Sequence, residues 1–196
     1  MRAVQLLFSP GETWEKIALE KRSVLFIFFI SVLPAMLLGY GVEAYSMATW
    51  GVRRGEFGHL STVSQEIALK VFLINLALGT MSVFISAYIV KTTAESFHSQ
   101  VTFRQTFAAT AYSLLPVFLL HIFDAVPMIP TWACYGVGIA LALCWLYHGV
   151  GIVMKPEQTK GFGIFIFSIV TLTVITAFTH FVGIWVMEGK LWKANL

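Results

Sequence analysis

The chain has 196 residues, of which 58% are hydrophobic and only 12% are charged, and its mean hydropathy is +0.79. Because a soluble domain carries about 25% charged residues, this composition excludes an ordinary soluble domain and is typical of a membrane protein. The net charge is only +3 and the basic residues are dispersed, which excludes a nucleic-acid surface. We interpret the basic residues as topology signals and lipid-headgroup contacts.

Residues 1–22 precede the first apolar run, and we expect them to form an amphipathic segment in the membrane interface. Ser9 and Glu12 have the spacing of a capping box, with Pro10 at the favoured first helical position. The helix that follows places Trp14 on an apolar face. This pattern favours a short helix lying in the interface. Docking of this helix against a soluble partner is the alternative interpretation.

Five lipid-length apolar runs follow in the sequence. Each reaches or approaches the roughly 20 residues that a helix needs to cross a bilayer. The first is longer than the apolar core of a cleavable signal sequence, so we expect it to be a retained span. The sequence therefore predicts an all-α polytopic membrane protein, in which residues 23–196 form a single five-transmembrane-helix bundle. The predicted spans are residues 24–42, 71–90, 107–123, 132–153 and 162–187.

Local signals mark the start of the third span and two kinks. Thr102 and Gln105 form a second capping-box pattern, in which each side chain reaches the backbone amide of the other. Pro116 lies inside the apolar run of the same span, and Pro34 lies inside that of the first. Because proline has no amide hydrogen, each predicts a kink in its helix.

The distribution of Lys and Arg predicts the orientation. With the N-terminus inside, eight basic residues lie on the inner side and five on the outer side. This bias favours an inner N-terminus and an outer C-terminus, and we expect the bacterial cytoplasmic (inner) membrane as the location. The inner set is Arg2, Lys16, Lys21, Arg22, Lys91, Arg104, Lys155 and Lys160; the outer set is Arg53, Arg54, Lys70, Lys190 and Lys193.

The sequence contains no P-loop, GxGxxG, GxSxG, HExxH or CxxC motif, so we expect no catalytic residues, no cofactor and no enzymatic activity. Glu43, His121, Asp124 and His180 all fall near the outer ends of their predicted spans. The favoured interpretation is that they bond to water and headgroups in the interface. A His and carboxylate metal site is an alternative. A haem held between His121 and His180 is another.

The last span carries small and hydroxyl-bearing residues on one face, whereas its remaining surface is largely Ile, Val, Leu and Phe. Such a face lets helices approach closely and bond across the contact. We therefore expect it to pack within the bundle or against a partner. Its residues are Ser168, Thr173, Thr176, Thr179 and Gly183, with His180 beside them.

Two short segments carry a family resemblance. The first contains Pro10 and Trp14, in FSPGETWEKI; the second contains Phe103, Gln105, Tyr112 and Pro116, in FRQTFAATAYSLLP. Together they resemble the Yip-domain family (Ypt-interacting proteins, named for binding Rab-type GTPases). The resemblance implies a five-helix membrane fold and a non-enzymatic role. The short N-terminal segment is similar to that of bacterial members, so GTPase binding is not carried over to this chain.

The favoured function is that of an accessory or scaffold subunit of a membrane complex, or of a homo-oligomer, acting through lateral helix contacts. We expect its partners to be the lipid bilayer and other membrane-protein subunits or copies of itself. A transporter or channel for a small solute is the first alternative. A metal- or haem-binding subunit of a membrane enzyme is the second.

Overall fold

The computed structural model describes residues 5–6, 9–54, 59–126, 129 and 131–187; within these ranges the side chains at 52–54, 59–61, 124, 131, 158–159, 180, 184 and 187 lie outside the description. The described chain is mostly helical, with one short hairpin. Five helical stretches are long and apolar enough to cross a membrane. The prediction of an all-α polytopic membrane protein is therefore confirmed.

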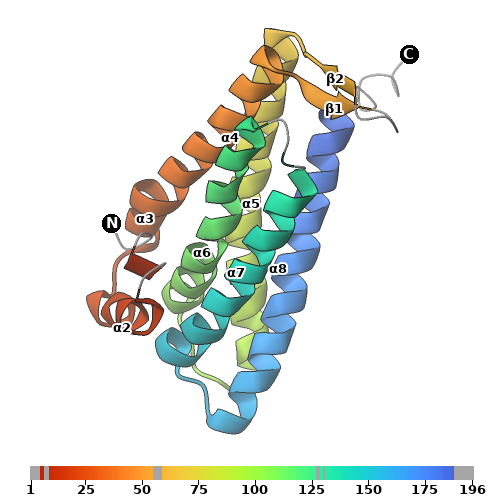
Figure 1. The fold of residues 1–196 in the computed structure, drawn as a ribbon. Coiled ribbons are helices and arrows are strands. Elements are labelled where there is room, and N and C mark those ends of the chain that lie inside the picture. Colours follow the sequence, from red (N-terminus) through yellow and green to blue (C-terminus); the bar gives the residue numbers. More distant parts are fainter. Residues whose placement is uncertain (1–4, 7–8, 55–58, 127–128, 130, 188–196) are drawn as a thin grey trace.

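The spans alternate in direction along the bundle, as Figure 1 shows. Helix α2 lies at one end of the bundle, called here the α2 end, and the hairpin lies at the other end. The described elements are α2 (Pro10–Glu20), α3 (Val24–Ile27), η1 (Phe28–Val32), α4 (Leu33–Thr49), β1 (Val52–Arg54), β2 (His59–Ser61), α5 (Gln65–Ser96), α6 (Phe103–Leu120), η2 (His121–Ala125), α7 (Thr131–Gly149), η3 (Val150–Met154) and α8 (Gln158–Met187).

The helices extend beyond the apolar runs of the sequence, and α5 shows why. It has 32 residues, with a Ser64 N-cap whose hydroxyl accepts from the backbone amide of Ile67. Ion pairs at i,i+4 spacing lie near both ends: Lys70 with Glu66 at 2.6 Å, and Lys91 with Glu95 at 2.6 Å. Such pairs support helical turns in water. The helix therefore continues where the hydrophobic pattern stops.

A wide π-helical turn interrupts the first span just before Pro34. In this turn, η1, the amide of Leu33 donates to the carbonyl of Phe28, five residues back. Pro34 follows directly and cannot donate to Ile30. The expected irregularity at Pro34 thus takes the form of a π turn, which reroutes the hydrogen bonds around the missing amide.

Helix α4 ends in a glycine turn that leads into a short hairpin. Gly51 has a φ of 90°, and its amide donates to the carbonyl of Ser46 at 3.1 Å. Glycine adopts this backbone conformation without steric cost, so it is a frequent residue just beyond a helix end. Strands β1 and β2 then pair antiparallel, with Val52 opposite Ser61.

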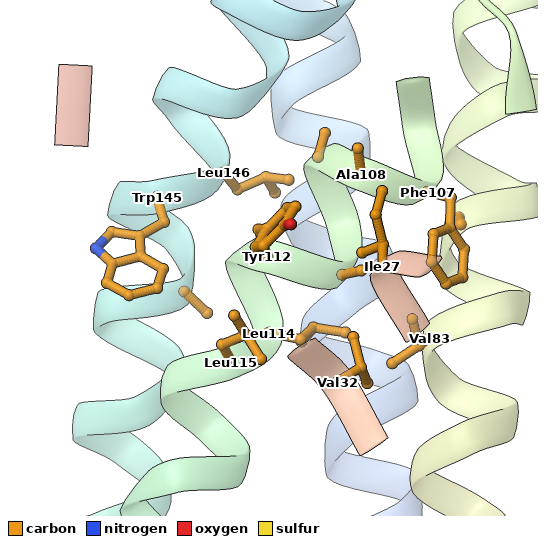
Figure 2. Packing of buried hydrophobic residues seen from close by; sticks show 14 of the residues in the cluster. Ile27, Val32, Val83, Phe107, Ala108, Tyr112, Leu114, Leu115, Trp145 and Leu146 are labelled. Carbon is orange, nitrogen blue, oxygen red and sulfur yellow. The ribbon is translucent and has the colours of Figure 1, made fainter. Parts of the chain in front are cut away.

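Helix α6 lies at the centre of the bundle and contacts α4, α5 and α7. In the most apolar stretch of this span 78% of the residues are buried, whereas in the corresponding stretch of the last span only 22% are. The last span packs mainly on α5. Alanines at positions such as 108, 109 and 111 allow the neighbours of α6 to approach closely. Figure 2 shows part of this core, including Tyr112, Leu114, Leu115, Val83 and Leu146.

Candidate functional site

A small cavity lies at the α2 end, between α2, the start of the first span, α6 and η3. Its volume is about 60 Å³. Its lining combines apolar side chains with the cationic Lys21, Arg22 and Arg104, and Tyr112 also lines it. The apolar residues among the lining are Ile17, Ala18, Ile27, Ala108 and Val153.

The capping box predicted at the start of α6 is confirmed, and it belongs to this cavity. The Thr102 hydroxyl accepts from the Gln105 amide at 3.4 Å, while the Gln105 side-chain oxygen accepts from the Thr102 amide at 2.9 Å. The side-chain nitrogen of Gln105, Nε2, also donates to the Val153 carbonyl at 3.1 Å. Gln105 therefore both starts α6 and joins it to η3.

Helix α2 packs on the bundle through Trp14, which is fully buried. The Trp14 ring meets the Tyr112 ring edge-on, with centroids 6.2 Å apart. It also lies over Gly149, where a Cβ atom would come within 2.9 Å of the indole. The apolar face of α2 is thus covered by the chain's own bundle.

The capping box predicted at Ser9 is wrong. Ser9 makes no side-chain cap bond, although Pro10 does occupy the start of α2 as expected. The Thr13 hydroxyl instead donates to the Ser9 carbonyl at 2.7 Å, and Glu12 pairs with Lys16 at 3.8 Å. Glu12 lies on the exposed side of α2, so it forms this ion pair and the reciprocal cap is not made.

Only some of the residues that carry the family resemblance lie at this cavity. Trp14, Gln105 and Tyr112 gather at the cavity or against its wall. Phe103 contacts the Phe107 ring at a centroid distance of 5.9 Å, and Pro116 is buried within α6.

A second group of polar residues lies inside the bundle toward the hairpin end. The Glu43 carboxylate and the His121 ring approach to 3.5 Å, with both residues 8% exposed. The Tyr40 ring contacts the His121 ring, with centroids 5.2 Å apart. Two of the four residues that were matched by depth thus lie next to each other, buried in the bundle. The sequence analysis did not single out Tyr40, which lies one helical turn before Glu43.

The other two members of the proposed metal site cannot be placed against this pair. The side chains of Asp124 and His180 lie outside the described residues. Among the side chains that are described, no three His, Cys, Asp or Glu residues cluster closely enough to hold a metal ion. The metal and haem interpretations stay hypotheses.

Removing the histidine alone should destabilise the protein strongly. His121→Ala removes the imidazole that lies beside the buried Glu43 carboxyl group, and the loss of a buried polar contact costs about 1–3 kcal/mol. Unfolding of the purified protein in a denaturing-detergent titration measures the loss. Glu95→Ala, which removes an exposed i,i+4 pair with Lys91, is the control and should change stability by less than about 1 kcal/mol. Equal losses in the two variants would contradict a buried contact between His121 and Glu43.

The hydroxyl-bearing face of α8 lies toward the bundle. Ser168 and Thr176 are buried, and Thr173 and Thr179 are half-buried. The Tyr135 hydroxyl donates to the Thr176 hydroxyl at 3.0 Å and so joins α7 to α8. Gly183 packs against the Asn75 side chain of α5, where a Cβ atom would come within 2.9 Å of the amide oxygen.

The cations around the α2-end cavity were the residues that sequence reasoning undervalued. Lys21, Arg22 and Arg104 were interpreted as dispersed topology signals and lipid-headgroup contacts, and the sequence did not indicate that Lys21 and Arg104, 83 positions apart, meet at one site. The structure brings them together through a hydrogen bond from the Arg104 guanidinium to the Lys21 carbonyl at 3.2 Å. Their positions next to the ends of predicted spans were the available signal.

Comparison with known proteins gives one match. A family model described as the Yip1 domain matches residues 4–188. No curated protein and no solved structure gives a significant match. The matched range includes both segments of the resemblance and all five candidate spans.

Proposed function

Because this chain belongs to the Yip1 domain family, we propose that it is a non-enzymatic membrane protein that acts through lateral helix contacts, as an accessory or scaffold subunit or as a homo-oligomer. The observation that carries this proposal is the peripheral position of α8. Its inward face is used by α5 and α7, and its outward face consists of large apolar side chains. The exposed ones are Phe162, Ile166, Phe167, Val170, Val174, Phe178, Phe181 and Trp185.

The outward face of α8 differs from a purely aliphatic lipid-facing surface, because five of its exposed side chains are aromatic. Aromatic side chains supply large contact areas at helix–helix and protein–protein contacts. The lipid bilayer and a neighbouring subunit are the two environments that such a face fits. The proposal is that a second protein chain covers part of it.

The proposed orientation has the N-terminus and the α2 end on the inner side of a bacterial cytoplasmic membrane. Its support is the excess of basic residues assigned to that side, eight against five. The cationic cavity at the α2 end lies on the same side. In this orientation the hairpin faces outward.

Cross-linking within native membranes tests the lateral contact. In a Cys144→Ala background, we expect Val174→Cys on the outward face to give one discrete cross-linked species with a homobifunctional thiol reagent. Thr176→Cys, two residues away on the buried face, is the matched control and should give none. Gentle-detergent purification with native mass measurement then identifies the cross-linked chain as a copy or as another subunit.

A series of cysteines at positions 166, 170, 174 and 178 that gives no discrete species, together with a monomeric native mass, means that lipid alone covers α8. A smear that scales with protein density would indicate random collision and counts against a specific contact.

A further inference from the structure

The α2-end cavity lies beside the starts of two candidate membrane spans. Lys21 and Arg22 stand immediately before the candidate span Val24–Thr49, and Arg104 is the second residue of the candidate span Phe103–Phe123. All three line the cavity. The starts of the first and third candidate spans therefore both bring cationic side chains to the same end of the bundle.

The cations around this cavity outnumber the anions. Arg22 forms an ion pair with Glu20 at 2.7 Å, and Glu20 also lines the cavity. Arg104 is held by the Lys21 carbonyl, a neutral group. Among the described side chains, no ion pair joins a carboxylate to Lys21 or Arg104. The site therefore has a net positive charge that a ligand anion would balance.

A buried polar group on the cavity wall points to the same kind of ligand. Tyr112 lines the cavity and is 1% exposed, and its hydroxyl has no hydrogen-bond partner among the described residues. A buried hydroxyl without a partner costs about 1–3 kcal/mol. A ligand oxygen inside the cavity would remove that cost.

We propose that the α2-end cavity binds the phosphate of an anionic phospholipid. Arg104 and Lys21 contact the phosphate oxygens, and the Tyr112 hydroxyl donates to an oxygen of the headgroup. A volume of about 60 Å³ has room for roughly four water-sized groups, which suits a phosphate group and excludes an acyl chain. The acyl chains stay in the bilayer, and apolar lining residues such as Ile17 and Ile27 face the carbon atoms next to the phosphate.

The location of the cavity favours a lipid over a free phosphate ion. A basic pocket between membrane helices at the headgroup level is a common form of lipid-headgroup site. A soluble anion would need no apolar lining, whereas half of this wall is apolar. In either case the cavity would recognise a phosphate group, so the experiment must distinguish a phospholipid from a free phosphate ion.

The experiment uses the full chain in phosphatidylcholine nanodiscs with and without phosphatidylglycerol of the same acyl chains. Retention of phosphatidylglycerol is measured by native mass spectrometry from 0.5 M salt, where the Debye length is about 4 Å and diffuse attraction is screened. We expect the Lys21→Gln/Arg104→Gln variant to retain phosphatidylglycerol about tenfold less than the native protein. The control is Lys16→Gln/Lys155→Gln, which removes two charges that lie outside the cavity lining; it should change retention by less than about twofold.

A third variant separates loss of the cavity from loss of charge. Ala18→Phe places an aromatic ring on the cavity wall from α2 and leaves every cation in place. We expect it to reduce retention as the double variant does, with thermal unfolding in pure phosphatidylcholine unchanged. Phosphatidylglycerol should raise the unfolding temperature of the native protein and not that of Ala18→Phe.

Equal losses in the cavity and control double variants mean that surface charge alone attracts the lipid, and the proposal is overturned. Stabilisation of the native protein by inorganic phosphate in phosphatidylcholine, at the level that phosphatidylglycerol gives, assigns the cavity to a soluble anion and also overturns it. Full retention by Ala18→Phe shows that the lipid binds elsewhere.

Discussion

Gly39→Ala is expected to destabilise the bundle by about 2–3 kcal/mol or more, because α4 and α6 touch there through their backbones. A Cβ atom on residue 39 would overlap the carbonyl oxygen of Phe118 and would lie 3.3 Å from the Cβ of His121. A backbone oxygen inside a central helix cannot rotate away as a side chain can. The helices must therefore separate, and the Glu43–His121 pair one turn further along would lengthen.

A denaturing-detergent unfolding titration measures this effect, and Gly136→Ala is the matched control. A Cβ atom at Gly136 in α7 meets nothing within 4 Å, and alanine favours a helix over glycine by about 1 kcal/mol. We expect the control to be neutral or slightly stabilising. The same small change in both variants would mean that α4 and α6 are further apart than the structure has them.

Trp14→Ala is expected to release α2 from the bundle while the five spans stay folded. Replacing a fully buried aromatic residue by alanine costs about 3–5 kcal/mol, and here almost the whole loss falls on one short helix. Limited trypsin digestion should then cut after Lys16 and Lys21 many times faster than in the native protein. Hydrogen exchange of the α2 amides should rise with it, and exchange within α6 should not.

The partner surface offers an independent check on the same contact. Gly149→Ala places a Cβ atom 2.9 Å from the Trp14 ring and should also release α2. Gly151→Ala lies two residues further on, where an added Cβ atom meets nothing within 4 Å, so its digestion should match the native protein. Protection of Lys16 in both Trp14→Ala and Gly149→Ala would mean that α2 is held by other contacts.

The features that could be predicted from the sequence are those set by local or cumulative signals. Five apolar stretches of lipid length predict five spans, because hydrocarbon thickness fixes how many apolar residues a helix must supply. The Thr102–Gln105 box is confirmed because both partners lie within one helical turn. At Ser9 the same pattern failed, since its acidic partner, Glu12, lies exposed and pairs with Lys16.

The features that could not be predicted depend on contacts between distant segments. The central position of α6 follows from the close approach of α4 and α7 to its backbone, and no single span reveals that. Trp14 meets Gly149 only when the intervening spans have folded, because the two residues are far apart in the chain. The Glu43–His121 pair was approached through a shared depth in the membrane, but depth alone does not say which faces of two helices meet.

The two residues of the Glu43–His121 pair are 78 positions apart in the chain, so they are synthesised at different times. A ribosome delivers the first span, with its glutamate, long before the imidazole of η2 exists. During that interval a carboxyl group stands near the end of a helix with its later neighbour still untranslated. Entry of α6 and η2 supplies that neighbour and the backbone surface on which α4 and α5 pack. The third span thus supplies the central surface against which α4 and α5 pack, and α8, made last, adds its buried Ile164 and Leu172 to the same core.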